Sequence, residues 1–188
     1  MSIQNEINRI INGVNSQTEI IAQIKTALQG KAIGADPYEV INSAIKGTLT
    51  EFYTLENWDG YSSQTFGMLF NGQSDLVKWG MPNNTHNLEG YGFRYCNKLK
   101  YIDIGSPVSC HPALFYGRSL KGMTIVIRAE TPPTLSGTFS GSGFDSTTKI
   151  FVPKNSLEAY KAATNWSTYA DCFYAIEDYP EEVNYDNY

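Results

Sequence analysis

The sequence predicts an α+β protein with an N-terminal coiled-coil helix, a short β-solenoid of stacked repeats and a C-terminal capping helix. Three observations predict this fold class. Apolar residues over 3–28 follow the alternating spacing of a heptad repeat, and a period of about 23 residues recurs through the middle of the chain. A capped helical pattern then begins at Asn155 or Ser156.

The first segment, residues 1–30, is predicted to be a coiled-coil stalk for assembly and docking. Isoleucine at both core positions of the heptad favours trimers over dimers, and the polar residue Gln17 is expected to fix the register. The alternative is a helix packed against its own domain, which shows a similar apolar stripe. The predicted oligomerisation residues are Ile3, Ile7, Ile10, Val14, Gln17, Ile21, Ile24 and Leu28.

Residues 31–47 are predicted to form a short helix that caps the N-terminal end of the repeats. Asp36 is in the N-cap position, Pro37 occupies the first turn and Gly47 ends the helix. A strand is predicted at residues 48–55, where the repeat domain of residues 48–178 begins.

Apolar residues of the repeat domain align in columns when the chain is shifted by about 23 residues. One strand per repeat cannot bury its apolar residues alone, so parallel stacking of the strands is expected. This pattern predicts a leucine-rich-repeat-like β-solenoid with a phenylalanine ladder on its second wall. The columns are Trp79, Ile102 and Ile125; Met81, Ile104 and Ile127; and Phe70, Phe93 and Phe115, with Phe144, Ile150 and Val152 in a fourth, degenerate copy.

Residues between the apolar columns are predicted to point outward and to form one continuous face. Such faces of repeat proteins commonly bind partners, although a solvated face without a partner has the same pattern. The candidate binding residues are Lys78, Tyr101, Asp103, Thr124, Arg128, Lys149 and Phe151.

The C-terminal end is predicted to be a cap followed by a solvated tail. In the helical pattern of residues 154–166, Leu157, Tyr160 and Ala163 are expected to face inward. Residues 179–188 form an acidic tail without a basic residue, so solvent exposure is expected.

Composition limits the possible partners. The chain has 188 residues and a formal net charge of −5, which argues against nucleic acid or an anionic membrane as the main partner. The start of the sequence has no signal-peptide pattern, and no run approaches the roughly 20 apolar residues of a membrane helix. We expect a protein that is made in a cytoplasm and not exported through a signal peptide.

The sequence contains only weak candidates for catalytic or metal-binding motifs. His86 and His111 have no neighbour at metal-ligand spacing, and the adjacent Cys110 and His111 are expected to point in different directions. We therefore predict no catalytic residue, no metal and no cofactor. The cysteines, expected to be reduced, are Cys96, Cys110 and Cys172. The enzymatic alternative is glycan cleavage by paired carboxylates, Asp59 with Asp75 or Asp103.

The stretches YCNKLKYIDIG, IRAETPPTL and IFVPKNSLEAYKAATNWSTYAD resemble the BspA-like leucine-rich repeat family, over about residues 48 to 178. The N-terminal order of heptad segment, D-P-Y-x-V-I helix and GTLTEF resembles the opening of tail, baseplate or head fibre proteins from phages of gut Firmicutes. The stretches SPVSCHPALF and NNTHNLEGYGF depart from the family pattern V-T-S-I-G-x-x-A-F.

The resemblance implies a non-enzymatic virion structural protein, namely a trimeric phage fibre or appendage subunit. Its implied partners are its own copies, virion proteins through the N-terminus, and host glycan or protein through the repeat domain, with no nucleic acid or membrane. The alternatives are a bacterial cell-surface leucine-rich-repeat adhesin, an intracellular interaction module and a glycan-degrading appendage enzyme.

Overall fold

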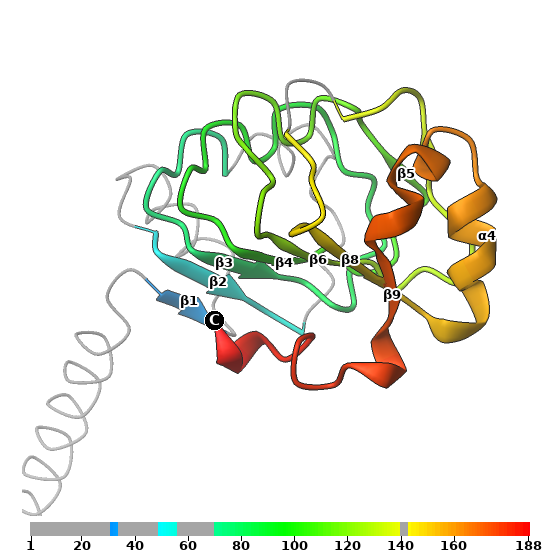
Figure 1. Cartoon of the computed structure of the whole chain (residues 1–188). Helices are drawn as coiled ribbons and strands as arrows, with labels where there is room; N and C mark the ends of the chain where they lie inside the picture. Colours follow the sequence, from blue (N-terminus) through cyan, green and yellow to red (C-terminus); the bar gives the residue numbers. More distant parts are fainter. Residues whose placement is uncertain (1–30, 34–48, 56–69, 140–142) are drawn as a thin grey trace, which may run out of the picture.

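The structure is a computed structural model that describes residues 31–33, 49–55, 70–139 and 143–188 (Figure 1). Within them, seven strands form a parallel sheet in the order β1-β2-β3-β4-β6-β8-β9, and β5 and β7 form a second, smaller sheet. The strands are β1 (Lys31–Ile33), β2 (Glu51–Tyr53), β3 (Lys78–Gly80), β4 (Tyr101–Asp103), β5 (Ser109–Cys110), β6 (Thr124–Val126), β7 (Thr134–Leu135), β8 (Lys149–Val152) and β9 (Phe173–Ala175).

The predicted fold class is wrong, because the described residues are mostly parallel sheet and their helices are short. The predicted coiled coil and its eight oligomerisation residues lie outside the described residues, and so does the helix predicted to begin at Asp36. Lys31–Ile33, which were assigned to the N-terminal cap, form strand β1 and pair with β2. The described helices are η1 (Lys154–Ser156), α4 (Leu157–Ala162), η2 (Trp166–Cys172), η3 (Ile176–Asp178) and η4 (Tyr185–Asn187).

The C-terminal helix is much shorter than predicted. Helix α4 has six residues and ends because Ala163 is extended and Asn165 has a left-handed backbone with φ of 65°. The Ser156 hydroxyl donates to the Glu130 carbonyl instead of capping the helix. Tyr160 does face inward as predicted, since its ring is fully buried and its hydroxyl donates to the Ala129 carbonyl at 2.8 Å.

The predicted apolar columns are confirmed by the register of the main sheet. Trp79 pairs with Ile102, Ile102 with Ile125, and Ile125 with Ile150, and all four side chains are buried. Each parallel pair places equivalent residues side by side, so one face of the sheet is a continuous apolar core.

The predicted phenylalanine ladder lies across the core from the sheet. Phe70 stacks on Phe93 with ring centroids 5.7 Å apart, and Phe93 stacks on Phe115 at 6.0 Å. The next ring is Phe139, at 5.4 Å from Phe115, and Phe144 follows at 5.8 Å from Phe139. An aromatic residue at the usual spacing therefore bridges the long interval that the sequence pattern left between Phe115 and Phe144.

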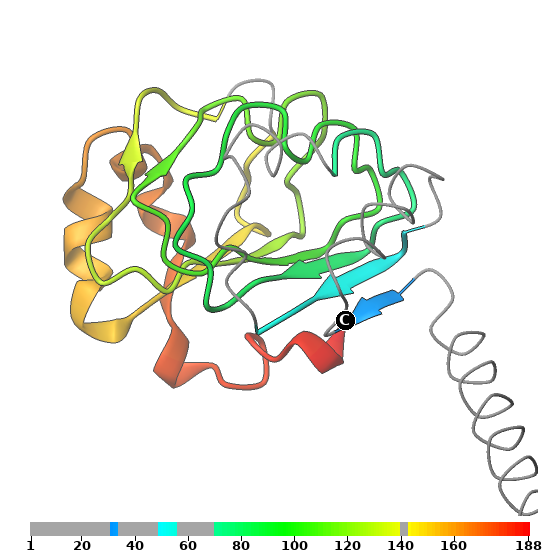
Figure 2. The same cartoon turned by 180° about the vertical axis from the view of Figure 1, so that it is seen from behind.

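The returns between strands lie on one side of the main sheet, and the C-terminal residues lie on the other side. In Figures 1 and 2 the green returns arch over the sheet, while the red C-terminal residues run beneath it from β9 toward β2. Helix α4 lies at the end of the sheet near β8 and β9. None of the described helices is long and apolar enough to cross a membrane.

Candidate functional site

The outward face of the main sheet carries most of the predicted binding residues. Parallel pairing in register places Lys78, Tyr101, Thr124 and Lys149 in one row, and Gly80, Asp103, Val126 and Phe151 in the next. The structure therefore brings six of the seven candidates together on β3, β4, β6 and β8. The seventh, Arg128, follows β6 and reaches back to Asp103.

Residues 179–188, here called the C-terminal segment, lie against this face (Figure 1). Tyr101 and Phe151 are 1% and 0% exposed, and Lys78, Asp103 and Thr124 are also buried. The tail that was predicted to be solvated thus packs against the sheet. An external partner can reach Tyr101, Asp103 and Phe151 only if the C-terminal segment leaves the face, whereas the side chains of Arg128 and Lys149 are 36% and 38% exposed.

Aromatic side chains make most of the apolar contact between the C-terminal segment and the sheet. The Tyr185 ring lies 4.5 Å from the Tyr53 ring and 5.8 Å from the Tyr101 ring, and the Tyr188 ring lies 4.7 Å from Tyr101. The Lys78 ammonium lies 4.3 Å from the centroid of the Tyr185 ring, which adds a cation–π contact.

Polar groups of the sheet face bind the backbone and side chains of the C-terminal segment. Lys78 Nζ donates to the Tyr185 carbonyl at 3.3 Å, and the Tyr101 hydroxyl donates to the Val183 carbonyl at 2.8 Å. The hydroxyls of Thr124 and Tyr188 are 2.8 Å apart. The ion pair between Lys149 and Glu182 joins the acidic segment to a basic residue of the face.

Tyr185 is anchored by its ring and not by its hydroxyl. The hydroxyl is buried and has no hydrogen-bond partner among the described residues, and burial raises the pKa of Tyr185 above its ordinary value. A buried polar group without a partner costs about 1–3 kcal/mol. The contact between the C-terminal segment and the sheet is therefore weaker than its aromatic area implies.

Asp103 and Arg128 form an ion pair at the edge of this face. One carboxylate oxygen of Asp103 accepts from Arg128 Nε at 2.8 Å and from Nη2 at 2.6 Å, while the other accepts from the Gly105 N–H at 3.1 Å. Burial raises the pKa of Asp103, and the hydrogen bonds from Arg128 act in the opposite direction. Because both oxygens are occupied, Asp103 serves here as an anchor for Arg128.

The carboxylate pair of the enzymatic alternative is not assembled within the described part of the chain. Asp59 lies outside it, and Asp75 is half-exposed and paired with Lys98 at 2.6 Å. Asp103 is fully buried by comparison. Across residues 31–33, 49–55, 70–139 and 143–188, no group of three His, Cys, Asp or Glu residues is placed to hold a metal ion.

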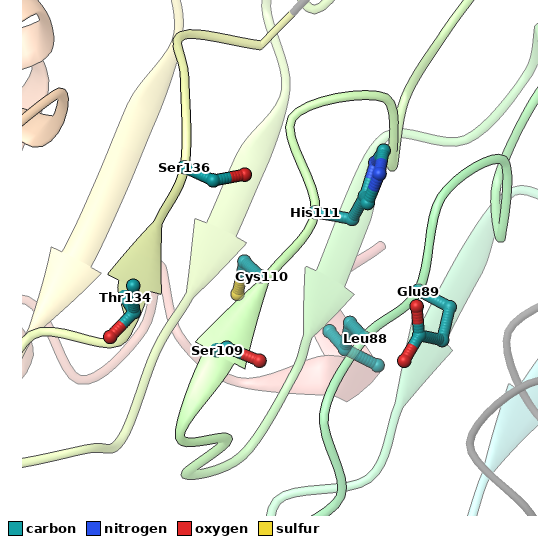
Figure 3. A pocket seen from close by; sticks show the side chains of 7 residues that line it. All are labelled: Leu88, Glu89, Ser109, Cys110, His111, Thr134 and Ser136. Carbon is teal, nitrogen blue, oxygen red and sulfur yellow. The ribbon is translucent and has the colours of Figure 1, made fainter.

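A small pocket of about 200 Å³ lies between the two-stranded sheet and the return before it (Figure 3). His111 Nδ1 accepts a hydrogen bond from the Ala113 N–H at 3.0 Å, which holds the ring in its own turn. Burial raises the pKa of Cys110 to about 12, so its thiol stays protonated near neutral pH. The side chains of Cys110 and His111 point in different directions, as predicted (Figure 3). The lining residues are Leu88, Glu89, Ser109, Cys110, His111, Thr134 and Ser136.

A cluster of exposed tyrosines on the returns was not predicted from the sequence. Tyr91, Tyr95 and Tyr116 are each at least 40% exposed, and all three surround the guanidinium of Arg94. One signal was present in the repeat alignment, because Tyr95 occupies the column in which the neighbouring repeats have Gly72 and Gly117.

Comparison with protein-family models found no matching family, and comparison with curated proteins found no match.

Proposed function

We propose that this chain is a non-enzymatic virion structural protein, a phage fibre or appendage subunit with a binding surface for the host or for a partner virion protein. In this proposal the chain forms a homotrimer, and residues 1–30 dock it to other virion proteins. The resemblance of the sequence to repeat proteins of phage virions supports the virion part of the proposal.

The binding part rests on the difference between the two sides of the described structure. The C-terminal segment covers the sheet face, where Tyr101, Asp103 and Phe151 are fully buried. The returns, by contrast, expose Tyr91, Tyr95 and Tyr116. Exposed aromatic side chains supply a large contact area at a low entropic cost. We therefore propose that the returns form the surface that meets the partner, while the sheet and the C-terminal segment provide a rigid support.

Electron microscopy of intact particles tests the virion part. Gold-labelled antibody against residues 70–188 is expected to mark fibres or other appendages. Particles that contain the protein by immunoblotting but bind no antibody on intact appendages would argue for an internal position and against the proposal.

Binding of the purified full chain to cells that the phage infects tests the binding part. Saturable binding is expected, and Tyr116→Ala should weaken it. Tyr179→Ala removes a comparably exposed tyrosine from the covered side of the sheet and serves as the matched control. Equal loss in both variants, or no saturable binding of the parent chain, would contradict the proposal.

A further inference from the structure

We propose that Tyr91, Arg94, Tyr95 and Tyr116 form a binding site for an acidic carbohydrate, a pyranose that carries a carboxylate. The inference rests on the proposed function and names the class of ligand that the exposed returns would take.

The guanidinium of Arg94 lies among three ring faces. Its Cζ atom is 4.4 Å from the Tyr95 ring centroid, 5.3 Å from that of Tyr91 and 5.5 Å from that of Tyr116. Tyr91 and Tyr116 meet edge to face with centroids 5.6 Å apart. The cluster thus combines aromatic surface, on which the C–H face of a sugar ring can pack, with a cation at its centre.

The charge of Arg94 is not neutralised by a carboxylate of the described residues. Its Nη2 donates to the Tyr95 hydroxyl at 2.7 Å, and its Nε is buried without a hydrogen-bond partner among the described residues. Its Nη1 makes no hydrogen bond to the described residues. In a chain with a net charge of −5, a cation left unpaired between exposed rings favours an anionic ligand.

The backbone fixes the rings before any ligand arrives. The N–H groups of Tyr91 and Tyr116 both donate to the Ala113 carbonyl, at 2.9 and 3.1 Å. The Tyr95 ring packs against Gly117, where an added Cβ atom would come within 2.6 Å of Tyr95 Cε1. A preorganised surface of this kind loses little conformational entropy on binding.

Tyr91 and Tyr95 both adopt left-handed backbone conformations, with φ of 67° and 60°. The equivalent positions of Tyr95 in the adjoining repeats are Gly72 and Gly117, whose φ values are 78° and 77° and which tolerate this conformation without strain. A tyrosine in this position is disfavoured, so its ring must contribute something that glycine cannot. Strained residues of this kind concentrate at ligand sites.

Isothermal titration of the full chain with tri-galacturonic acid, and with neutral galactotriose as the comparison, tests the proposal. The acidic trisaccharide is expected to bind more tightly. Arg94→Gln is expected to weaken its binding roughly tenfold, because a charge-assisted hydrogen bond is lost. Tyr116→Ala should weaken the binding of both sugars. Lys100→Gln removes an exposed cation near the cluster in sequence and should leave binding unchanged.

The outcomes separate this inference from the proposed function. Equal affinity for the two sugars, or no effect of Arg94→Gln, overturns the acidic ligand. If neither sugar binds while Tyr116→Ala still reduces cell binding, the inference fails and the proposed function stands. If the acidic sugar binds as expected but the chain does not bind cells, the proposed function fails alone.

Discussion

The hydroxyl of Tyr101 donates a hydrogen bond to the carbonyl of Val183 at 2.8 Å, and 82 residues of chain separate them. The middle of the sheet thereby holds the C-terminal segment in place. Tyr101 was predicted to face an external partner, but in the structure it contacts the C-terminal segment of its own chain. The stability of the fold and access to the sheet face are consequently linked.

Removal of the hydroxyl should have opposite effects on stability at Tyr185, in the C-terminal segment, and at Tyr101, on the sheet. Tyr185→Phe removes a buried hydroxyl that has no partner among the described residues, so we expect unchanged stability or a gain of about 1 kcal/mol. Tyr101→Phe removes the hydrogen bond to Val183 and should cost about 1 kcal/mol. Urea denaturation measures both, and a larger loss in Tyr185→Phe than in Tyr101→Phe would contradict the assigned roles.

Replacement of Gly80 should loosen the C-terminal segment. A Cβ atom there would lie 2.6 Å from Tyr53 Cδ2, so the Tyr53 ring must shift, and this ring packs on Tyr185 with centroids 4.5 Å apart. We expect Gly80→Ala to cost about 1–3 kcal/mol by overpacking and to speed proteolysis near the C-terminus. Gly137→Ala is the matched control, since its nearest contact would be an ordinary 3.8 Å. Similar proteolysis rates in the two variants would rule out this packing role.

The buried ion pair of Asp103 with Arg128 should contribute more to stability than the exposed ion pair of Asp75 with Lys98. Arg128→Ala leaves the fully buried Asp103 without its main partner, and we expect a loss of about 3 kcal/mol. Lys98→Ala breaks an equally short pair with Asp75, but both side chains are half-exposed or more, so a loss below about 1 kcal/mol is expected. Urea denaturation of the two variants measures the difference, and equal losses would count against the buried pair as an anchor.

Alkaline pH should destabilise the fold through buried thiols. Burial raises the pKa of Cys96 and of Cys110 from an ordinary 9.0 to about 12. A raised folded-state pKa means that the unfolded chain loses its thiol protons first. The stabilising contribution is complete below pH 9 and is lost as the pH rises toward 12, by about 1.4 kcal/mol per pH unit for each thiol.

Thiol titration with a coloured disulfide reagent provides a second measurement. All three cysteines are free and buried, so reaction at pH 8 should be slow in the native protein and fast in urea. Stability in urea should meanwhile fall between pH 9 and 11 in the parent chain and less steeply in Cys110→Ala. Fast native reaction, or a flat stability profile over this range, would contradict the burial of these thiols.

The register of the main sheet was predictable because apolar residues recur at a fixed interval. Trp79, Ile102 and Ile125 had to align if each repeat supplied one strand, and the pairing confirms it. Helix length was less predictable, because the pattern after Ser156 suits a helix longer than the observed α4. Asn165, whose left-handed conformation helps to end the helix, donates from its side chain to the Leu135 carbonyl at 2.6 Å, and the helical pattern does not show such a distant contact.

The position of the C-terminal segment could not be predicted from its composition. Its acidic and polar residues are typical of a solvated tail, and Tyr185 alone does not identify a docking surface. A different signal was present in Tyr101 and Phe151, because two large aromatic residues at outward positions of the same sheet face, on β4 and β8, favour a cover over that face.

Spacing along the chain specifies which residues stack in the core, because that spacing sets the register of parallel strands. Which surface is open depends instead on contacts between residues far apart in the sequence, so it follows from the folded structure. Tyr101 with Val183 closes the sheet face, and Tyr91 with Tyr116 gathers rings around Arg94 on the returns. No local pattern encodes either contact, since each forms only after the strands have aligned.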